Sequence, residues 1–236
     1  METVNSERRP RTWFKRIANV VLVLSVTLVA LYFVASWIWR FSGSNQWELV
    51  GERKGVKVYS LKAPGADLTQ VKGVVRVRAS LATLVKFMQD PDLCKDLGCK
   101  NSIVVKRVDD QLQYVSFRYN LPFPFRARDF VVRTEAYQNP HTKEVLLEFA
   151  AAPDKAPPND CCFRVTDMNN TWRFTPVGNG LVEIEYIQNM NEGGFLPNLL
   201  LNRMRPKVLF AVLPRLQRFA ERERYRNASF DFIKEP

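Results

Sequence analysis

The chain has 236 residues, of which 46% are apolar and 12% aromatic, so it has room for one ordinary domain with a sizeable core and is not a disordered protein. Its formal charge of +11 lies at the two ends: residues 1–16 carry +3 and residues 198–226 carry +6, while residues 41–197 carry only +2. A nearly neutral body with basic ends favours contact with an anionic membrane surface and argues against a nucleic-acid partner.

The first element in chain order is an apolar segment from Ile17 to Trp39, which holds 23 residues and no charge. As a helix it is roughly 34 Å long, enough to cross a hydrocarbon core of about 30 Å. Trp37 and Trp39, followed by Arg40, are typical of an interfacial aromatic belt. We therefore expect a transmembrane helix over 17–39, between a basic tail over 1–16 and a linker over 40–46.

The charges around this segment predict its orientation. Five cations precede it and one follows closely, so the N-terminus is expected in the cytoplasm and the domain on the other side. In a Gram-negative bacterium that side is the periplasm. A cleaved signal peptide is the alternative to a signal anchor, because Val34-Ala35-Ser36 is a usable cleavage site. The apolar run exceeds the usual 7–15 residues of such a peptide. Both interpretations place the domain outside the cytoplasm.

Beyond the linker, apolar and polar residues alternate with a period of two. This alternation predicts half-buried antiparallel strands over 71–79, 114–119, 144–149 and 182–186. Turn residues separate these strands at Asp109-Asp110, Asn139-Pro140 and Gly178-Asn179-Gly180.

Two segments change to helical spacing. Ser80 is a suitable N-cap for a short helix that ends at Asp90-Pro91. A long terminal segment, expected to kink or break at Pro206 and Pro214, has one apolar stripe: Leu196, Leu200, Met204, Val208, Val212, Leu216 and Phe219. The order of elements predicts an α+β domain over 47–226, a curved antiparallel sheet closed by a long C-terminal helix, with a tail over 227–236.

Several segments, in order, resemble the START (StAR-related lipid transfer) domains with their helix-grip fold. The best-marked motif is Leu121–Val131, in which Pro122-Phe123-Pro124 is followed by Arg128-Asp129. The other similar segments are Trp47–Val50, Lys54–Tyr59, Trp172–Pro176, Gly178–Tyr186, Gly193–Pro197 and Asn202-Arg203. The likeness runs from about residue 47 to 220 and indicates a bacterial-type START domain behind a transmembrane helix.

The resemblance implies that the chain binds one lipid in a tunnel between sheet and C-terminal helix and transfers it between membranes or to partners. A bent sheet with one helix cannot fill its own concavity, so a long apolar guest would complete the core. The cations of the C-terminal helix are expected to contact the membrane surface. The alternatives are a cyclase-like or hydrolase-like enzyme on the same fold, and a lipid sensor that does not transfer.

The resemblance and the residue patterns together indicate the candidate site. Gly193 and Gly194 form a candidate hinge for the lid helix. Thr134 stands where some sterol-binding members carry a cavity arginine, and Arg133 faces the other side of its strand, so the likeness does not extend to sterol specificity. The candidate lipid-binding residues are Arg118, Arg128, Asp129, Trp172, Tyr186, Leu200, Met204 and Val208. Arg128 and Asp129 are adjacent in a strand, so pairing with neighbouring strands is an alternative role for each.

Catalysis and cofactors have little support in the sequence. The sole histidine, His141, follows Asn139-Pro140 in an expected turn, so no histidine-dependent triad can be assembled. We expect no catalytic residue, no metal and no cofactor; an enzyme that uses the carboxylate of Asp129 is the remaining alternative. The four cysteines do not have the spacing of a zinc site. A disulfide such as Cys94–Cys99 would suit an oxidising compartment, whereas neighbouring cysteines rarely bridge each other.

Overall fold

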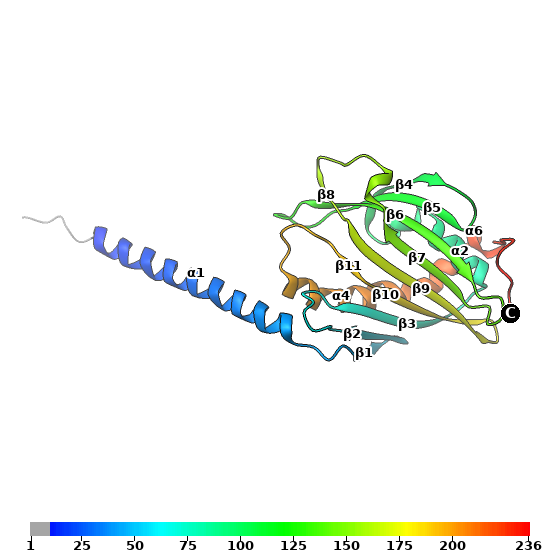
Figure 1. Ribbon diagram of the computed structural model, residues 1–236, viewed down its shortest axis with the longest axis horizontal. Helices are drawn as coiled ribbons and strands as arrows, with labels where there is room; N and C mark the ends of the chain where they lie inside the picture. Colours follow the sequence, from blue (N-terminus) through cyan, green and yellow to red (C-terminus); the bar gives the residue numbers. More distant parts are fainter. Residues whose placement is uncertain (1–9) are drawn as a thin grey trace, which may run out of the picture.

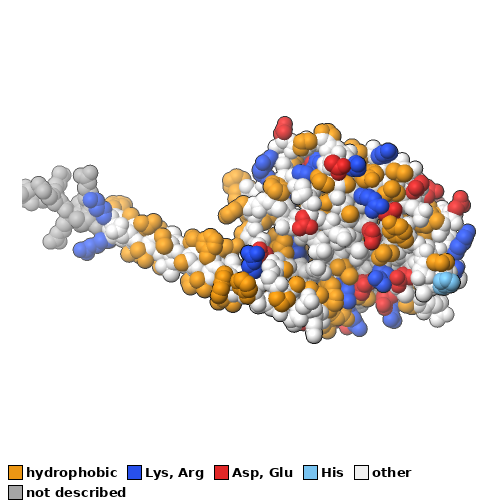
Figure 2. All heavy atoms as spheres, in the orientation of Figure 1, with side chains coloured by type: hydrophobic (Ala, Val, Ile, Leu, Met, Phe, Trp, Pro, Cys, Tyr) orange, Lys and Arg blue, Asp and Glu red, His pale blue; other side chains and the backbone are white. Residues whose placement is uncertain are grey.

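The computed structural model describes residues 10–236, with side chains from residue 13 on. Helix α1 (Pro10–Phe41) projects from one end of a domain that contains all the other elements (Figure 1). Its segment Trp13–Phe41 has a mean hydropathy of 2.5 over the most apolar window, none of which is buried by the rest of the chain. Apolar side chains cover α1 along its length (Figure 2). The helix is long and apolar enough to span a membrane and extends beyond the expected 17–39 at both ends.

The domain is built on a curved sheet of eleven strands, with α4 along one side (Figure 1). The strand order is β1-β2-β3-β10-β9-β7-β6-β5-β4, with β11 beside β9 and β8 beside β6. All pairings are antiparallel except the short β6–β8 pair. The bounds are β1 (Trp47–Arg53), β2 (Val56–Leu61), β3 (Gln70–Arg78), β4 (Cys99–Arg107), β5 (Leu112–Tyr119), β6 (Ala127–Gln138), β7 (Val145–Ala151), β8 (Cys162–Arg164), β9 (Asp167–Gly178), β10 (Leu181–Gln188) and β11 (Met190–Asn191).

The expected α+β architecture is confirmed, with one correction. Strands β1 and β4 form the two edges of the described sheet, so the sheet is curved but not closed. The alternation seen in the sequence puts one row of apolar side chains on the concave face. Val75, Ile184, Phe174 and Val145 lie next to one another across β3, β10, β9 and β7, and all are buried. This row forms the centre of the core.

The short helix α2 (Leu81–Gln89) has the expected ends. The Ser80 hydroxyl accepts a hydrogen bond from the amide of Thr83 at 3.1 Å, and Asp90 is the C-cap. The segment 227–236, expected to be a tail, instead packs on the domain. The carboxylate of Glu235 accepts from the amides of Leu81 and Ala82, both at 3.0 Å, where the helix dipole favours a negative charge.

The C-terminal helix runs as α4 (Asn198–Val212), a 3₁₀ turn η2 (Leu213–Arg215) and α5 (Leu216–Ala220). Pro206 lies inside α4 without ending it, whereas the α-helix gives way to the 3₁₀ turn around Pro214. Leu209 and Leu213 pack on β3 at Gly73, where a side chain would collide with Leu213. The buried stripe of the segment is Arg205, Leu209, Leu213, Leu216 and Phe219.

This buried stripe differs from the expected one. Leu200, Met204 and Val208 are 46%, 48% and 46% exposed, so they do not pack into the core. The apolar spacing in the sequence identified a helix correctly, and Leu216 and Phe219 are buried as expected. Within α4 the expected face is wrong, because the face that meets the sheet is decided by the partners on β3. The remaining short elements are α3 (Leu93–Asp96), η1 (Pro153–Lys155) and α6 (Glu223–Arg226).

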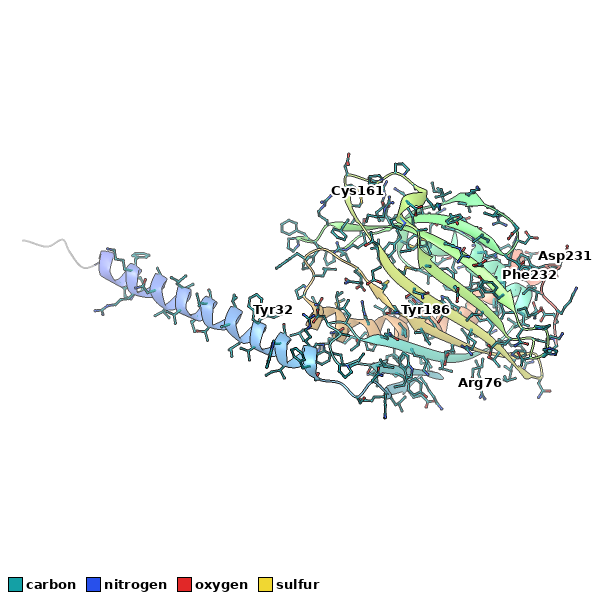
Figure 3. The ribbon with its side chains drawn as sticks, viewed as in Figure 1. Tyr32, Arg76, Cys161, Tyr186, Asp231 and Phe232 are labelled. Carbon is teal, nitrogen blue, oxygen red and sulfur yellow. A yellow bond between two sulfur atoms is a disulfide. The ribbon has the colours of Figure 1, made fainter. Side chains whose placement is uncertain are left out.

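Two disulfides are present in the described chain. Cys94, in α3, is bridged to Cys99 at the start of β4. Cys161 is bridged to its neighbour Cys162, a pairing that the sequence analysis expected to be rare. Figure 3 shows Cys161 in the loop that leads into β8.

Candidate functional site

The concave face of the sheet carries two separate core clusters. The larger one lies under α2, α4 and α5, and the smaller one contains Phe130, Val132, Val165 and Met168. Side chains between and beside the two clusters are only half-buried although they lie on the inner side of the domain. We call this set the inner surface: Phe117, Tyr119, Phe149, Tyr186 and Met190. Aromatic side chains in a packed core are normally buried, so the inner surface is only partly covered by the rest of the domain.

One flank of α4 contributes to the same side of the molecule. Phe210 lies against β1, with its ring 5.1 Å from the guanidinium of Arg53. Val208 is two residues away, which places it about 200° around the helix, on the flank directed toward the β5 half of the sheet. Met204 lies one turn before Val208 and shares that flank. All three candidate lid residues, Leu200, Met204 and Val208, are about half-exposed, so they lie off the face of α4 that packs on β3.

Trp172 and Tyr186 are brought together at the middle of the concave face. Their rings stack with centroids 4.1 Å apart and planes at 22°. Figure 3 shows Tyr186 within the body of the sheet, and burial raises the pKa of its phenol. Gly73 is the cross-strand neighbour of Tyr186 on β3. Trp172 is 8% exposed and belongs to the core, so Tyr186 is the member of this pair that is available on the inner surface.

Arg128 lies on the concave face but is fully engaged with main-chain carbonyls. Its guanidinium donates to the carbonyl oxygens of Glu192 at 2.7 Å, Gly193 at 2.6 Å and Arg126 at 2.5 Å. The side chain is 3% exposed, and burial lowers the pKa of the guanidinium. Arg128 therefore anchors the segment that precedes α4, which corresponds to a structural role.

The candidate hinge glycines are held by the same anchor. Gly193 and Gly194 have φ of +63° and +67°, which glycine adopts without strain. A side chain on Gly193 would collide with the ring of Phe163, and one on Gly194 would come within 3.0 Å of the Arg128 guanidinium. Glycine is required here because Phe163 and Arg128 pack closely on the main chain.

Asp129 and Arg118 lie on the opposite, convex face. Asp129 accepts from Arg164 Nε at 2.8 Å and Nη2 at 2.7 Å, and its side chain is 4% exposed. Arg164 also donates to the carbonyls of Pro153, Ala156 and Pro157, so the pair organises the connection between β7 and β8. Arg118 is the cross-strand neighbour of Asp129 on β5. Neither side chain is directed at the inner surface, so their expected contact with a lipid head group inside the domain does not fit the strand register.

A second buried arginine, Arg205, was missed by sequence reasoning, which grouped it with the surface cations of a basic helix. It is 3% exposed and donates to the carbonyls of Thr69 and Met190, each at 2.6 Å, and to the carboxylate of Glu192 at 2.7 Å. The sequence signal for its burial is that Arg205 lies four residues before Leu209, so that both side chains share one face of the helix. Arg128 and Arg205 together hold residues 190–193 between the sheet and α4.

Comparison with known proteins gives one relative by sequence. No family model matches the chain. An uncharacterized protein of Pseudomonas aeruginosa is 24% identical over 183 residues, which is 77% of this chain and 88% of that protein.

Solved structures are similar over most of the domain. The STAR-related lipid transfer protein of Xanthomonas axonopodis has a TM-score of 0.69 at 23% identity, over 75% of this chain and 99% of that one. Human STARD10 has a TM-score of 0.66 at 15% identity, over 79% and 77% of the two chains. Human StAR-related lipid transfer protein 5 has a TM-score of 0.64 at 14% identity, over 84% and 97%. At these identities the likeness concerns the fold.

Proposed function

Because the chain has the fold of the START-type lipid transfer domains, behind one helix long enough to span a membrane, we propose that it binds a single lipid inside the domain and transfers it. The lipid chain lies against the inner surface, beneath the flank of α4 that carries Met204 and Val208. The observation that carries the proposal is the half-buried state of these aromatic and apolar side chains on the inner side of the domain. Burial of these side chains by a long apolar guest would contribute about 25 cal/mol of binding free energy per Å² of apolar surface.

The anchor defines which membrane the domain can reach. Only residues 42–46 connect α1 to β1, which is at most roughly 20 Å when extended. The domain therefore stays beside the membrane that holds α1 and reaches a second membrane only through a partner. The basic residues before the apolar segment 17–39 favour a cytoplasmic N-terminus and an extracytoplasmic domain. The two disulfides suit an oxidising compartment.

Contact of the domain with the same membrane has support of its own. Figure 1 shows the β5–β6 connection and the segment before α4 at the end of the domain from which α1 projects. Phe123 and Phe195 in these connections are 97% and 92% exposed. The exposed cations Arg203 and Lys207 follow on α4. Exposed aromatic tips with neighbouring cations suit an interface with anionic lipid.

The proposal contains no catalytic step. Asp129, the carboxylate considered for an enzyme on this fold, is buried on the convex face and paired with Arg164. His141 is exposed in the turn between β6 and β7. Neither group faces the inner surface where a substrate would lie.

Native mass spectrometry of the full chain released from detergent tests the binding step. We expect a mass increment of one lipid per chain. Ala151 lies on the concave face beside the inner surface, whereas its neighbour Ala150 lies on the convex face. Ala151→Trp should reduce lipid occupancy by filling the interior, and Ala150→Trp should leave it unchanged. A chain that carries no lipid after incubation with mixed vesicles, or equal occupancy in the two variants, would contradict the proposal.

Transfer is measured separately. The full chain is reconstituted in donor vesicles that hold a fluorescent lipid and are tethered to acceptor vesicles, because the tether takes the place of the partner. The rate at which the fluorescent lipid appears in the acceptor vesicles is recorded. We expect acceleration that Ala151→Trp abolishes. A lipid-bound chain that gives no acceleration would identify a sensor in place of a transfer protein.

A further inference from the structure

A pocket of about 310 Å³ opens beside the turn between α4 and α5. It is lined by Asp96 of α3 together with Arg215, Arg218, Phe219 and Arg222. α3 and the end of the C-terminal helix are far apart in sequence, and the pocket is formed only where these two elements meet. Its lining combines three guanidinium groups with one carboxylate and one aromatic ring.

The charges of this pocket are only partly compensated. Arg222 donates to Asp96 Oδ2 at 2.6 Å and lies over the ring of Phe219, with its guanidinium carbon 4.8 Å from the centroid. Arg222 holds the pKa of the Asp96 carboxyl below its ordinary value. Within residues 10–236, Arg215 and Arg218 make no ion pair or hydrogen bond through their side chains. Two positive charges are therefore left over on one wall.

The pocket borders the inner surface. The hydroxyl of Tyr119 donates to the carbonyl of Leu97, the residue that follows Asp96. Burial raises the pKa of the Tyr119 phenol, and the charge of Arg215 opposes that rise, so the guanidinium acts on this ring. Arg215 lies in η2, directly after α4. Tyr119 therefore connects the inner surface to the α3 side of the pocket, through the residue next to Asp96.

We propose that this pocket receives the phosphate head group of the bound lipid, through Arg215 and Arg218, while its chain lies on the inner surface. Arginine matches phosphate because its planar guanidinium donates two parallel hydrogen bonds. Two uncompensated charges balance the charge of a phosphate monoester. Arg222 is held by Asp96 and forms the fixed wall of the pocket. The inference rests on the proposed function, and it adds the class of lipid: one with an anionic phosphate head group.

Fluorescence binding with the detergent-solubilised full chain tests the inference. The probes are phosphatidic acid and phosphatidylcholine that carry the same fluorescent acyl chain. We expect the wild type to bind phosphatidic acid at least about tenfold more tightly, since the choline ester removes one anionic phosphate oxygen and adds a positive charge. Arg215→Gln combined with Arg218→Gln should remove this preference and weaken phosphatidylcholine binding much less than phosphatidic acid binding.

The matched control separates the pocket from the general basicity of the domain. Lys57→Gln combined with Lys106→Gln removes the same charge from exposed positions of β2 and β4 that do not line the pocket. It should keep the preference. Arg218→Gln alone is the second variant, with an intermediate effect expected, in case the double substitution impairs folding.

The outcomes distinguish the inference from the function on which it rests. Binding of neither probe by the wild type overturns both. Equal binding of the two probes, or loss of the preference in the control as well, overturns the inference and leaves lipid binding intact. Inorganic phosphate is tested as a third ligand. If the wild type binds it, the Arg215 and Arg218 variant does not, and it competes with neither lipid, the pocket is a site for free phosphate and the head-group role is overturned.

Discussion

The indole Nε1 of Trp39 and the amide Nδ2 of Asn202 donate to the same acceptor, the main-chain carbonyl of Asp67, at 3.2 and 2.9 Å. Trp39 belongs to the last turn of α1 and Asn202 to the second turn of α4. The end of α1 and the start of α4 therefore hold one loop, between β2 and β3. The Asn202 Oδ1 atom also accepts from the amide of Thr69 at 2.9 Å. The position of α4 at this end is thus linked to the end of α1 through this loop.

Replacement of Asn202 by alanine should loosen this connection. It removes the acceptor of Thr69 and one donor to Asp67, so we expect a loss of about 1–3 kcal/mol in the free energy of unfolding. Amide hydrogen exchange over residues 62–69 should become faster. Urea unfolding of the full chain in detergent measures the free energy of unfolding, and mass spectrometry measures the amide hydrogen exchange. Arg203→Ala, at the adjacent exposed position, is the control and should change neither quantity.

Replacement of Arg128 by methionine should release the segment before α4. Three carbonyls, those of Arg126, Glu192 and Gly193, would lose a charged donor in a buried setting. We expect a destabilisation of about 2–3 kcal/mol and faster exchange over residues 192–197. If Arg128 instead served only to bind a ligand, the variant would unfold at the same urea concentration as the wild type.

Gly73 is expected to tolerate no side chain. Gly73→Ala places a methyl group against Leu213 and Leu209, and overpacking of this kind costs about 1–3 kcal/mol. The control is Gly51→Ala on β1, where the nearest atom is Phe210 Cζ at 3.8 Å, an ordinary contact. Thermal unfolding followed by circular dichroism should show a lower midpoint for Gly73→Ala and an unchanged midpoint for Gly51→Ala. Equal midpoints would show that α4 does not pack on β3 as described.

Tyr186 should make the domain sensitive to alkaline pH. Burial raises the pKa of its phenol in the folded state, whereas the unfolded chain titrates near pH 10. Above that pH the unfolded state binds fewer protons than the folded state, so the contribution to stability is full below pH 10 and falls as pH rises toward the folded pKa. Tyr186→Phe should lose less stability than the wild type between pH 9 and 11, measured by urea unfolding. Parallel losses in both proteins would contradict this assignment.

Much of the fold follows from local pattern. The strands at 71–79 and 182–186, the Ser80 cap and the apolar N-terminal helix are encoded within a few neighbouring residues. The period of two also decided that Arg133 and Thr134 face opposite sides. The structure places Thr134 on the concave face, 4% exposed, and pairs Arg133 with Glu135.

The candidate site depended on contacts that no local pattern reports. Arg128 and Asp129 are candidates from the sequence, but the partners that tie them to other elements lie at residues 192–193 and 164, more than 30 positions away. The partners turn both residues into structural anchors. The pocket around Arg215 joins α3 to the end of the C-terminal helix, and the stretch between them in sequence gives no sign that they meet.

By itself, the sequence determined the element types, the membrane-spanning length of α1 and the basic character of the C-terminal helix, because periodicity, hydropathy and charge are properties of neighbouring residues. Only the tertiary structure decided which face of α4 is buried. Arg205 enters the interior, where the carbonyls of Thr69 and Met190 and the carboxylate of Glu192 replace its water, while Met204 and Val208 remain half-exposed. A buried arginine is stable only where distant segments bring acceptors to it, and such acceptors are set by the fold.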